Sequence, residues 1–181
     1  MTDENPWTRL AETDIYENAW IRVREYQVLN PAGRLGIYGT VSFKNRAVGI
    51  VPLADNGDTW LVGQYRFPLQ QYHWEIPMGG APAGESAADC AVRELREETG
   101  LCAATLEPLC RLHTSNCITD EEGLVFIARH LVQGEAQPEE TEVLMVKRLP
   151  FAEALAMVMD GRITDAISVA ALQRIRLLGL A

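Results

Sequence analysis

The stretch Gly79–Leu101, GGAPAGESAADCAVRELREETGL, carries the strongest helix signal in the chain and anchors the interpretation of the fold. Ser86 can cap the start of a helix, and Asp89 follows three residues later, an arrangement similar to a capping box. Gly100 stands where a helix commonly ends, because glycine adopts the left-handed conformation without strain. The sequence thus predicts a helix that begins after Ser86 and ends before Gly100.

Three glutamates crowd one side of this predicted helix. At about 100° per residue, Glu94, Glu97 and Glu98 share an arc of roughly 100°. The predicted core stripe lies on a different arc and consists of Ala88, Ala91, Val92, Leu95 and Thr99. Such a charge cluster is ordinarily a solvated face, and Arg93 and Arg96 would help to neutralise it. Clustered carboxylates also form the hard, all-oxygen site that Mg²⁺ or Mn²⁺ prefers, so the helix alone leaves both interpretations open.

Composition limits the classes of protein. The 181 residues fit a domain of ordinary size, and the 48% of hydrophobic residues can build a core. A net charge of −9 is a poor balance for binding long polyanions, so no nucleic acid partner is expected. If the protein binds phosphates, we expect it to use a few placed arginines together with metal ions.

The lack of a recognisable signal peptide or membrane span, together with the cysteine spacing, predicts a cytoplasmic protein. The N-terminal segment MTDENPWTRL lacks the basic and apolar regions of a signal peptide. No apolar run approaches the roughly 18 residues of a membrane span. The four cysteines form no CxxC pair, and no histidines stand at zinc-finger spacing. We therefore expect a cytoplasmic protein with buried, reduced thiols, no membrane partner and no zinc.

Outward from the helix, the pattern runs strands, helix, strands and then helices, which predicts an α+β layered domain. Strands are predicted over residues 15–51 with a turn at PAGR, in VGIVPLA and TWLVGQYRF, and in WEIPMGG, which would end in a loop. Later strands are predicted in LEPLCRLHT, GLVFIARHLV and TEVLMVKRL, and later helices in FAEALAMVMDG and from about Asp165 onward. Residues 1–46 form a predicted antiparallel β-sheet region, and residues 47–181 the main domain. Because so small a sheet is marginal alone, a partner subunit is expected to cover it.

The spacing around the helix is that of a known signature. Gly79, five residues, Glu85, seven residues and then Arg93-Glu94-Leu95-Arg96-Glu97-Glu98-Thr99-Gly100-Leu101 match every defined position of the Nudix box. The chain therefore resembles the Nudix hydrolases. The resemblance implies an α/β/α sandwich with a mixed central sheet, and hydrolysis of a nucleoside diphosphate linked to another group.

The resemblance also implies roles within the box. Two to three Mg²⁺ or Mn²⁺ ions per site would be held by Glu94, Glu97 and Glu98, with help from the Met78 carbonyl. Glu97 and Glu98 would thereby be part of the catalytic machinery. The remaining box residues would orient the loop and the helix: Gly79, Glu85, Arg93 and Gly100.

The segment before the box, VGQYRFPLQQYHWEIPMGG, resembles that of Nudix hydrolases acting on ADP-ribose and nucleotide sugars. This implies that Arg66 contacts the pyrophosphate and that Glu75 contacts substrate. A surface salt bridge is the plainer alternative for Arg66. An unpaired buried acid is costly, so Glu75 is expected to have a partner or a ligand.

Segments after the box, SNCITDEE, PEETEV and GRITDAISVAAL, extend the resemblance to about residues 15–175. An acidic loop in that group supplies the catalytic base or a metal ligand. Glu140 is the predicted base and Glu139 a predicted metal ligand, although Glu142 also stands in this run and a solvated turn remains an alternative. The stretch Ser115–Cys117 lacks a proline found in some ADP-ribose pyrophosphatases, which favours a broader nucleotide-sugar range.

Aromatic residues of the N-terminal region give two alternatives. Trp20, Tyr26 and Tyr38 could stack on a base or a sugar, and Trp20 and Tyr26 are the predicted substrate contacts. They could instead fill the core of the small sheet. The resemblance implies a homodimer that exchanges its N-terminal strands and builds composite sites.

Together these features predict a metal-dependent pyrophosphatase of nucleoside diphosphate sugars of the ADP-ribose, ADP-glucose or GDP-mannose type. Its products would be a nucleoside monophosphate and a sugar phosphate. The alternatives are hydrolysis of another nucleoside diphosphate derivative, such as a dinucleoside polyphosphate or capped RNA, and a Nudix-like ligand sensor without turnover.

Overall fold

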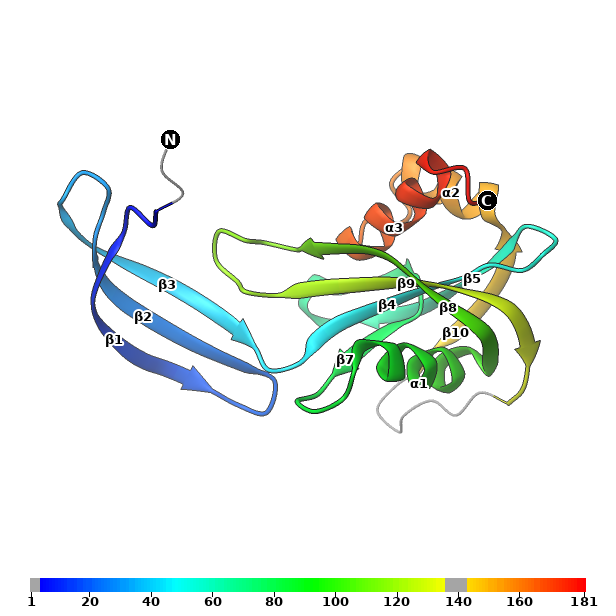
Figure 1. Ribbon diagram of the computed structural model, residues 1–181, viewed down its shortest axis with the longest axis horizontal. Helices are drawn as coiled ribbons and strands as arrows, with labels where there is room; N and C mark the ends of the chain where they lie inside the picture. The colour runs from blue at the N-terminus through cyan, green and yellow to red at the C-terminus, as the bar shows by residue number, and fades with distance from the viewer. Residues whose placement is uncertain (1–3, 136–142) are drawn as a thin grey trace. The chain divides into compact units, whose positions relative to one another are not determined.

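The computed structural model describes residues 4–135 and 143–181, which form two compact units (Figure 1). One unit comprises the residues up to Asn45 together with His113–Glu121, and the other Arg46–Leu112 together with Glu122–Ala181. Of the helices in these described residues, none is both long enough and apolar enough to span a membrane.

Strands dominate the described chain, and two of the helices follow the last strand. The strands are β1 (Thr8–Glu17), β2 (Ile21–Leu29), β3 (Leu35–Phe43), β4 (Arg46–Pro52), β5 (Asp58–Arg66), β6 (Gln71–Glu75), β7 (Met78–Ala81), β8 (Leu101–His113), β9 (Glu122–Gln133) and β10 (Met145–Pro150). The helices are α1 (Ala87–Thr99), α2 (Phe151–Met159), α3 (Ala166–Leu177) and the short 3₁₀-helix η1 (Phe67–Leu69).

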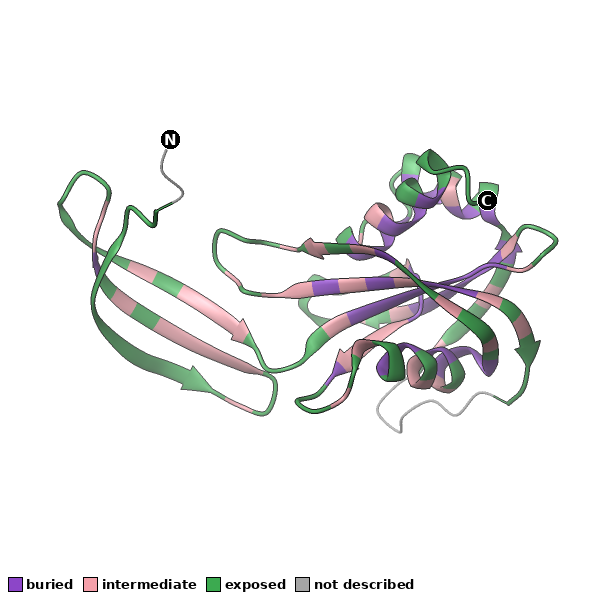
Figure 2. Cartoon of the chain, in the orientation of Figure 1, coloured by how far each residue is buried: buried purple, intermediate pink, exposed green. Residues whose placement is uncertain are grey.

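The N-terminal unit is an antiparallel sheet in the order β1-β2-β3. All ten residues of β1 are exposed, and Val28 is the one buried residue among those described in this unit (Figure 2). Register shifts in β1 fall at Leu10 and Ile15. Because a bulge breaks the period-two alternation, the sequence pattern placed the first strand too late, from residue 15 rather than from Thr8.

The second unit has three layers, with α1 on one side of the strands and α2 and α3 on the other (Figure 1). One sheet has the order β10-β5-β6, and the other has the order β7-β4-β9-β8. Strand β4 is parallel to β9 and antiparallel to β7, so the sheet is mixed. This arrangement confirms the predicted α/β/α sandwich with a mixed central sheet, and the β1-β2-β3 sheet of the other unit is the predicted small N-terminal antiparallel sheet.

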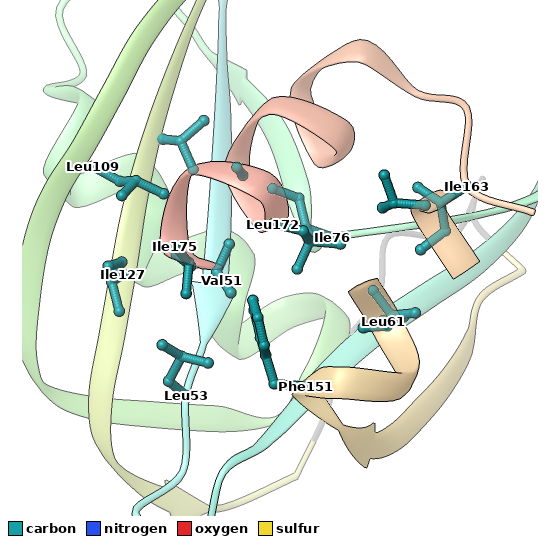
Figure 3. Packing of buried hydrophobic residues seen from close by; sticks show 14 of the residues in the cluster. Val51, Leu53, Leu61, Ile76, Leu109, Ile127, Phe151, Ile163, Leu172 and Ile175 are labelled. Carbon is teal, nitrogen blue, oxygen red and sulfur yellow. The ribbon is translucent and has the colours of Figure 1, made fainter. Parts of the chain in front are cut away.

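Strand β4 is buried on both faces, and its alternate residues belong to different cores. Val48 and Ile50 lie in the cluster that includes the buried apolar residues of α1. Val51, and Leu53 just beyond the end of β4, lie in the cluster with α2 and α3, which also contains Leu172 and Ile175 (Figure 3). Fully burying one such aliphatic side chain stabilises the fold by about 1.5–3 kcal/mol.

The segment Met78–Ala81 corrects a sequence prediction, because it is a strand and not a loop. It pairs with β4 in an antiparallel register that joins Met78 to Gly49 and Ala81 to Arg46. Two adjacent glycines give the segment the composition of a loop, and only its neighbour β4 makes it a strand. This pairing places the residues before α1 directly beside the central sheet.

Candidate active site

Helix α1 begins and ends where its sequence predicts. The Ser86 hydroxyl accepts the Asp89 amide at 3.1 Å and donates to the Asp89 carboxylate at 2.6 Å. The Gly100 φ angle is 72°, and its amide donates to the Arg96 carbonyl at 2.9 Å. Both ends are therefore fixed by local hydrogen bonds, which hold the glutamates between them in register.

The glutamate triad does not form a solvated face. Glu98 is only 2% exposed, and Glu94 and Glu97 are half-buried. The predicted core stripe is wrong at Ala88 and Val92, which are exposed. The buried residues of α1 are Cys90, Ala91, Leu95, Glu98 and Thr99. The buried face is thus turned toward the triad, and a carboxylate as deep as that of Glu98 requires polar contacts.

Arg93 connects three acidic side chains of the box. Its Nε and Nη2 donate to the two carboxylate oxygens of Glu85 at 3.0 and 2.9 Å. Its Nη1 donates to Glu94 at 2.7 Å and to Glu97 at 2.8 Å. These contacts raise the pKa of Arg93, with Glu85 contributing most, and Arg93 in turn lowers the pKa of the Glu85 carboxyl. The guanidinium therefore fixes the orientation of both the loop and the helix.

Strand β7 lies against the other side of the triad. The Met78 amide donates to Glu98 Oε2 at 3.0 Å. A Cβ built on Gly79 would lie 1.9 Å from Glu94 Oε1 and 2.4 Å from Glu94 Oε2. A side chain at position 79 would therefore displace the Glu94 carboxylate, which explains why glycine is needed there.

The donor set has the chemistry of a hard-cation site. It consists of carboxylate oxygens on one helix next to a backbone strand, which suits Mg²⁺ or Mn²⁺ better than softer metals. Among the residues that the structure describes, no three His, Cys, Asp or Glu side chains are gathered as a group that could hold a metal ion. Here the Arg93 guanidinium is a cation that contacts Glu94 and Glu97. The residue types fit a divalent cation, whereas these side-chain positions are those of an ion-paired arrangement.

Arg66 and Glu75, two predicted substrate contacts, bind each other. Arg66 Nε lies 2.9 Å from Glu75 Oε1, and Arg66 Nη2 also contacts the same carboxylate. Glu75 is only 3% exposed, so the expected partner for its buried charge is Arg66. Glu75 is the largest cause of the raised pKa of Arg66, and Asp165 and Glu98 contribute through space. Arg66 is thus surrounded by carboxylates from three parts of the chain.

The start of α3 supplies residues that the sequence analysis did not assign to the site. Asp165 caps α3, because its carboxylate accepts the Ser168 amide at 2.7 Å. The Ser168 hydroxyl accepts the Ile76 amide at 3.0 Å, and Thr164 Oγ1 lies 3.4 Å from His73 Nδ1. Asp165 followed three residues later by Ser168 is a recognisable helix start, but no local pattern shows that it meets β6.

The N-terminal aromatics have different surroundings. Trp20 is 69% exposed, so the alternative that it fills the small sheet's core is wrong. Tyr26 is half-buried, with the Arg9 guanidinium 4.6 Å from its ring centroid. Tyr38 packs edge-on against Trp7 at 5.4 Å. Substrate contact by Trp20 and Tyr26 stays a prediction.

The predicted acidic loop falls outside the described residues. Glu139, Glu140 and Glu142 all lie in the range 136–142. Their assignment as catalytic base and metal ligand therefore stays a prediction.

All four cysteines are free, in agreement with reduced thiols. Cys102 and Cys117 are exposed, so their predicted burial is wrong. Cys90 is buried on α1, and burial raises the pKa of its thiol to about 12.

Comparison with known proteins identifies the two parts of the chain. Residues 43–170 match the NUDIX domain, and residues 7–41 match the nucleoside diphosphate sugar hydrolase N-terminal domain. The ADP-ribose pyrophosphatase of Mycobacterium tuberculosis is 34% identical over 171 residues, covering 92% of this chain and 82% of the relative. The ADP-ribose pyrophosphatase of Bacillus subtilis is 33% identical, with 72% of each chain covered.

A solved structure gives the same fold. The crystal structure of an ADP compounds hydrolase superposes with a TM-score of 0.87 and covers 100% of this chain and 99% of its own, at 24% identity. The NUDIX match spans more than half of the chain and includes the complete Gly79–Leu101 signature. This protein therefore belongs to the Nudix family and is a hydrolase.

Proposed function

We propose that this protein is a divalent-cation-dependent pyrophosphatase of nucleoside diphosphate sugars, with ADP-ribose among its substrates. The products would be a nucleoside monophosphate and a sugar phosphate. The observation that carries the proposal is that one short segment contacts both the predicted pyrophosphate-binding arginine and the predicted cation-binding glutamates. Glu75 pairs with Arg66, and three residues later the Met78 amide donates to Glu98. The match to a nucleoside diphosphate sugar hydrolase N-terminal domain and the two pyrophosphatase relatives support this substrate class.

Glu94, Glu97 and Glu98 would hold the cations, two to three Mg²⁺ or Mn²⁺ ions per site, with the Met78 carbonyl as a further ligand. Bound divalent cations neutralise pyrophosphate charge and acidify a coordinated water. To serve as ligands, Glu94 and Glu97 would exchange their contacts with Arg93 Nη1 for the ion. Arg93 would keep its bidentate contact with Glu85 and so continue to hold the helix against the loop.

Arg66 would bind the pyrophosphate. Its side chain is 36% exposed, and its Nε and Nη2 are already oriented by Glu75. A guanidinium held in this way presents its remaining N–H groups to phosphate oxygens with little loss of side-chain entropy. Glu75 would thereby hold Arg66 in place and contact substrate groups beside it. Glu140, assisted by Glu139, would deprotonate or orient the attacking water.

The N-terminal unit would form a homodimer by strand exchange. Strand β1 is wholly exposed, and β3 exposes Leu35 and Ile37, so this unit leaves apolar surface uncovered in a single chain. Trp20 and Tyr26 would then stack on the base or sugar of the substrate. Sedimentation velocity at low micromolar concentration should show a dimer, and a monomer would contradict this part of the proposal.

Replacement of Glu98 by Gln tests the proposal. We expect the activity of Glu98→Gln on ADP-ribose to fall by about 10²-fold or more, because one charged ligand is lost and the Met78 contact is weakened. Circular dichroism should show an unchanged fold. Glu107→Gln, on the exposed part of β8, is the matched control and should retain full activity.

The substrate panel should include ADP-ribose, ADP-glucose, GDP-mannose and a dinucleoside polyphosphate, each with and without Mg²⁺ or Mn²⁺. Turnover of the polyphosphate alone would refute the substrate assignment. A folded Glu98→Gln protein with most of its activity would refute the assignment of the cation site.

A further inference from the structure

The short segment Glu75–Met78 is fixed residue by residue. Each of its four residues contacts a different element of the second unit. Glu75 pairs with Arg66 at the end of β5, the Ile76 amide donates to Ser168 of α3 at 3.0 Å, the Pro77 carbonyl accepts the Ile50 amide of β4 at 2.8 Å, and the Met78 amide donates to Glu98 of α1 at 3.0 Å. The segment therefore connects the Arg66–Glu75 pair to the glutamate triad.

The contact from α3 is made by a fully buried hydroxyl. Ser168 has no exposed surface, and Ile76 is 1% exposed, so water cannot replace Ser168 Oγ as the acceptor for the Ile76 amide. The backbone amide of Ser168 donates to the Asp165 carboxylate at 2.7 Å, and this hydrogen bond fixes the first turn of α3. A buried amide without an acceptor is destabilising, so the hydroxyl determines where Ile76 lies.

Side-chain packing limits movement at the same place. A Cβ built on Gly49 would lie 2.9 Å from Ile76 Cδ1 and 3.0 Å from Ile167 Cγ2. The side chains of Ile76 and Ile167 therefore cover Gly49 of β4, so that α3 and the segment pack against the same residue of the strand. Neither can shift without the other, because protein interiors are close-packed.

We propose that Ser168 is a positioning residue for the hydrolytic reaction. It acts through Ile76 on both sides of that residue, holding Glu75 against Arg66 on one side and, through Pro77, Met78 against Glu98 on the other. The proposal rests on the proposed function of this site. Ser168 itself touches neither substrate nor cation; its hydroxyl sets the distance between the group that binds pyrophosphate and the carboxylates that bind cations.

The test compares Ser168→Ala with Ile175→Val, a control in the same helix. Ile175 is also fully buried on α3 but lies two turns along the helix from Ser168. Both changes remove a small group from the core. Only the first should accelerate hydrogen exchange at the Ile76 amide, and it should lower kcat/KM by about ten- to a hundredfold, the size expected from a displacement near 1 Å. The control should keep kcat/KM within about twofold of the wild-type value.

Ser168→Cys adds a graded variant. Sulfur is larger than oxygen and a weaker acceptor, so the exchange rate of the Ile76 amide and the kcat/KM of Ser168→Cys should fall between those of the wild type and Ser168→Ala. Mn²⁺ binding to the substrate-free protein, followed by electron paramagnetic resonance, gives a readout besides activity. We expect the dissociation constant to rise several-fold in Ser168→Ala and to stay unchanged in Ile175→Val.

The proposal is overturned if Ser168→Ala keeps kcat/KM and Mn²⁺ affinity within twofold of wild type, or if both helix variants lose activity equally. If Ser168→Ala does not fold, a Ser168→Cys protein with wild-type kinetics overturns it in the same way. Failure of the proposed function is a different result: the wild-type protein would hydrolyse no nucleoside diphosphate sugar, whereas Ile76 exchange and Mn²⁺ binding would still report on Ser168.

Discussion

Replacing Arg66 with methionine should destabilise the fold as well as impair the reaction. The substitution keeps an unbranched side chain like the aliphatic part of arginine but removes the guanidinium that contacts both oxygens of Glu75. The Glu75 carboxylate would then remain 3% exposed with its main cationic partner gone. Breaking a buried ion pair in this way destabilises proteins by about 3–5 kcal/mol. Because the Arg66 side chain is 36% exposed and water screens it, we expect the lower value of about 2–3 kcal/mol.

The assay is thermal unfolding at neutral pH, in which each kcal/mol shifts the Tm of a chain of this size by about 2–4 °C. Arg66→Met should therefore lower Tm by about 4–12 °C. Adding Glu75→Met removes the unpaired charge and should recover most of this loss, since apolar pairs can replace buried ion pairs at little cost. Activity on nucleotide sugars should stay low in both variants. A single variant within about 1 °C of wild type, or a double variant no more stable than the single one, would refute this account of the pair.

Three further predictions concern the box helix and the loop before it. Gly79→Ala should lower kcat at least tenfold with little change in Tm, because its Cβ would displace the Glu94 carboxylate; unchanged kinetics would contradict this. Arg93 lowers the pKa of Glu85, so their contact stabilises the folded protein above about pH 4.5. This contribution to stability is lost as the pH falls through the folded-state pKa of Glu85. Arg93→Met should thus flatten the acid side of a Tm–pH profile, and an equally steep profile would argue against the linkage. Cys90, buried and with a pKa of about 12, should react slowest of the four thiols with an aromatic disulfide at pH 8; a fast reaction would show that α1 opens.

Local signals were sufficient where local contacts determine the structure. Both ends of α1 are made by residues within a few positions of each other, so Ser86 and Gly100 could be interpreted from sequence alone. The burial of Glu98 could not, because it depends on the Met78 amide of β7 and on the pairing of that strand with β4. A helical wheel shows which residues share a side, but not which side meets the protein.

The pairing of Arg66 with Glu75 was also beyond the sequence. Each residue was a candidate on its own, and a partner for the buried acid was expected, but the identity of the partner depends on the register of β5 and β6. Contacts from α3 are more remote still: Ser168 and Ile76 are 92 positions apart. The residues around the box were therefore predictable as a set, whereas the connections among them required the fold.

Strand β4 has a consequence for how the second unit unfolds. Its residues alternate between two cores, and its parallel register with β9 joins Ile50 to Phe126 and Val51 to Ile127. A slip by one residue would exchange the two sets of side chains and disrupt both layers at once. Neither helical layer can then melt while the other stays intact. Hydrogen exchange should therefore find the slowest amides of β4 and β9 opening together with the whole unit, as one cooperative block.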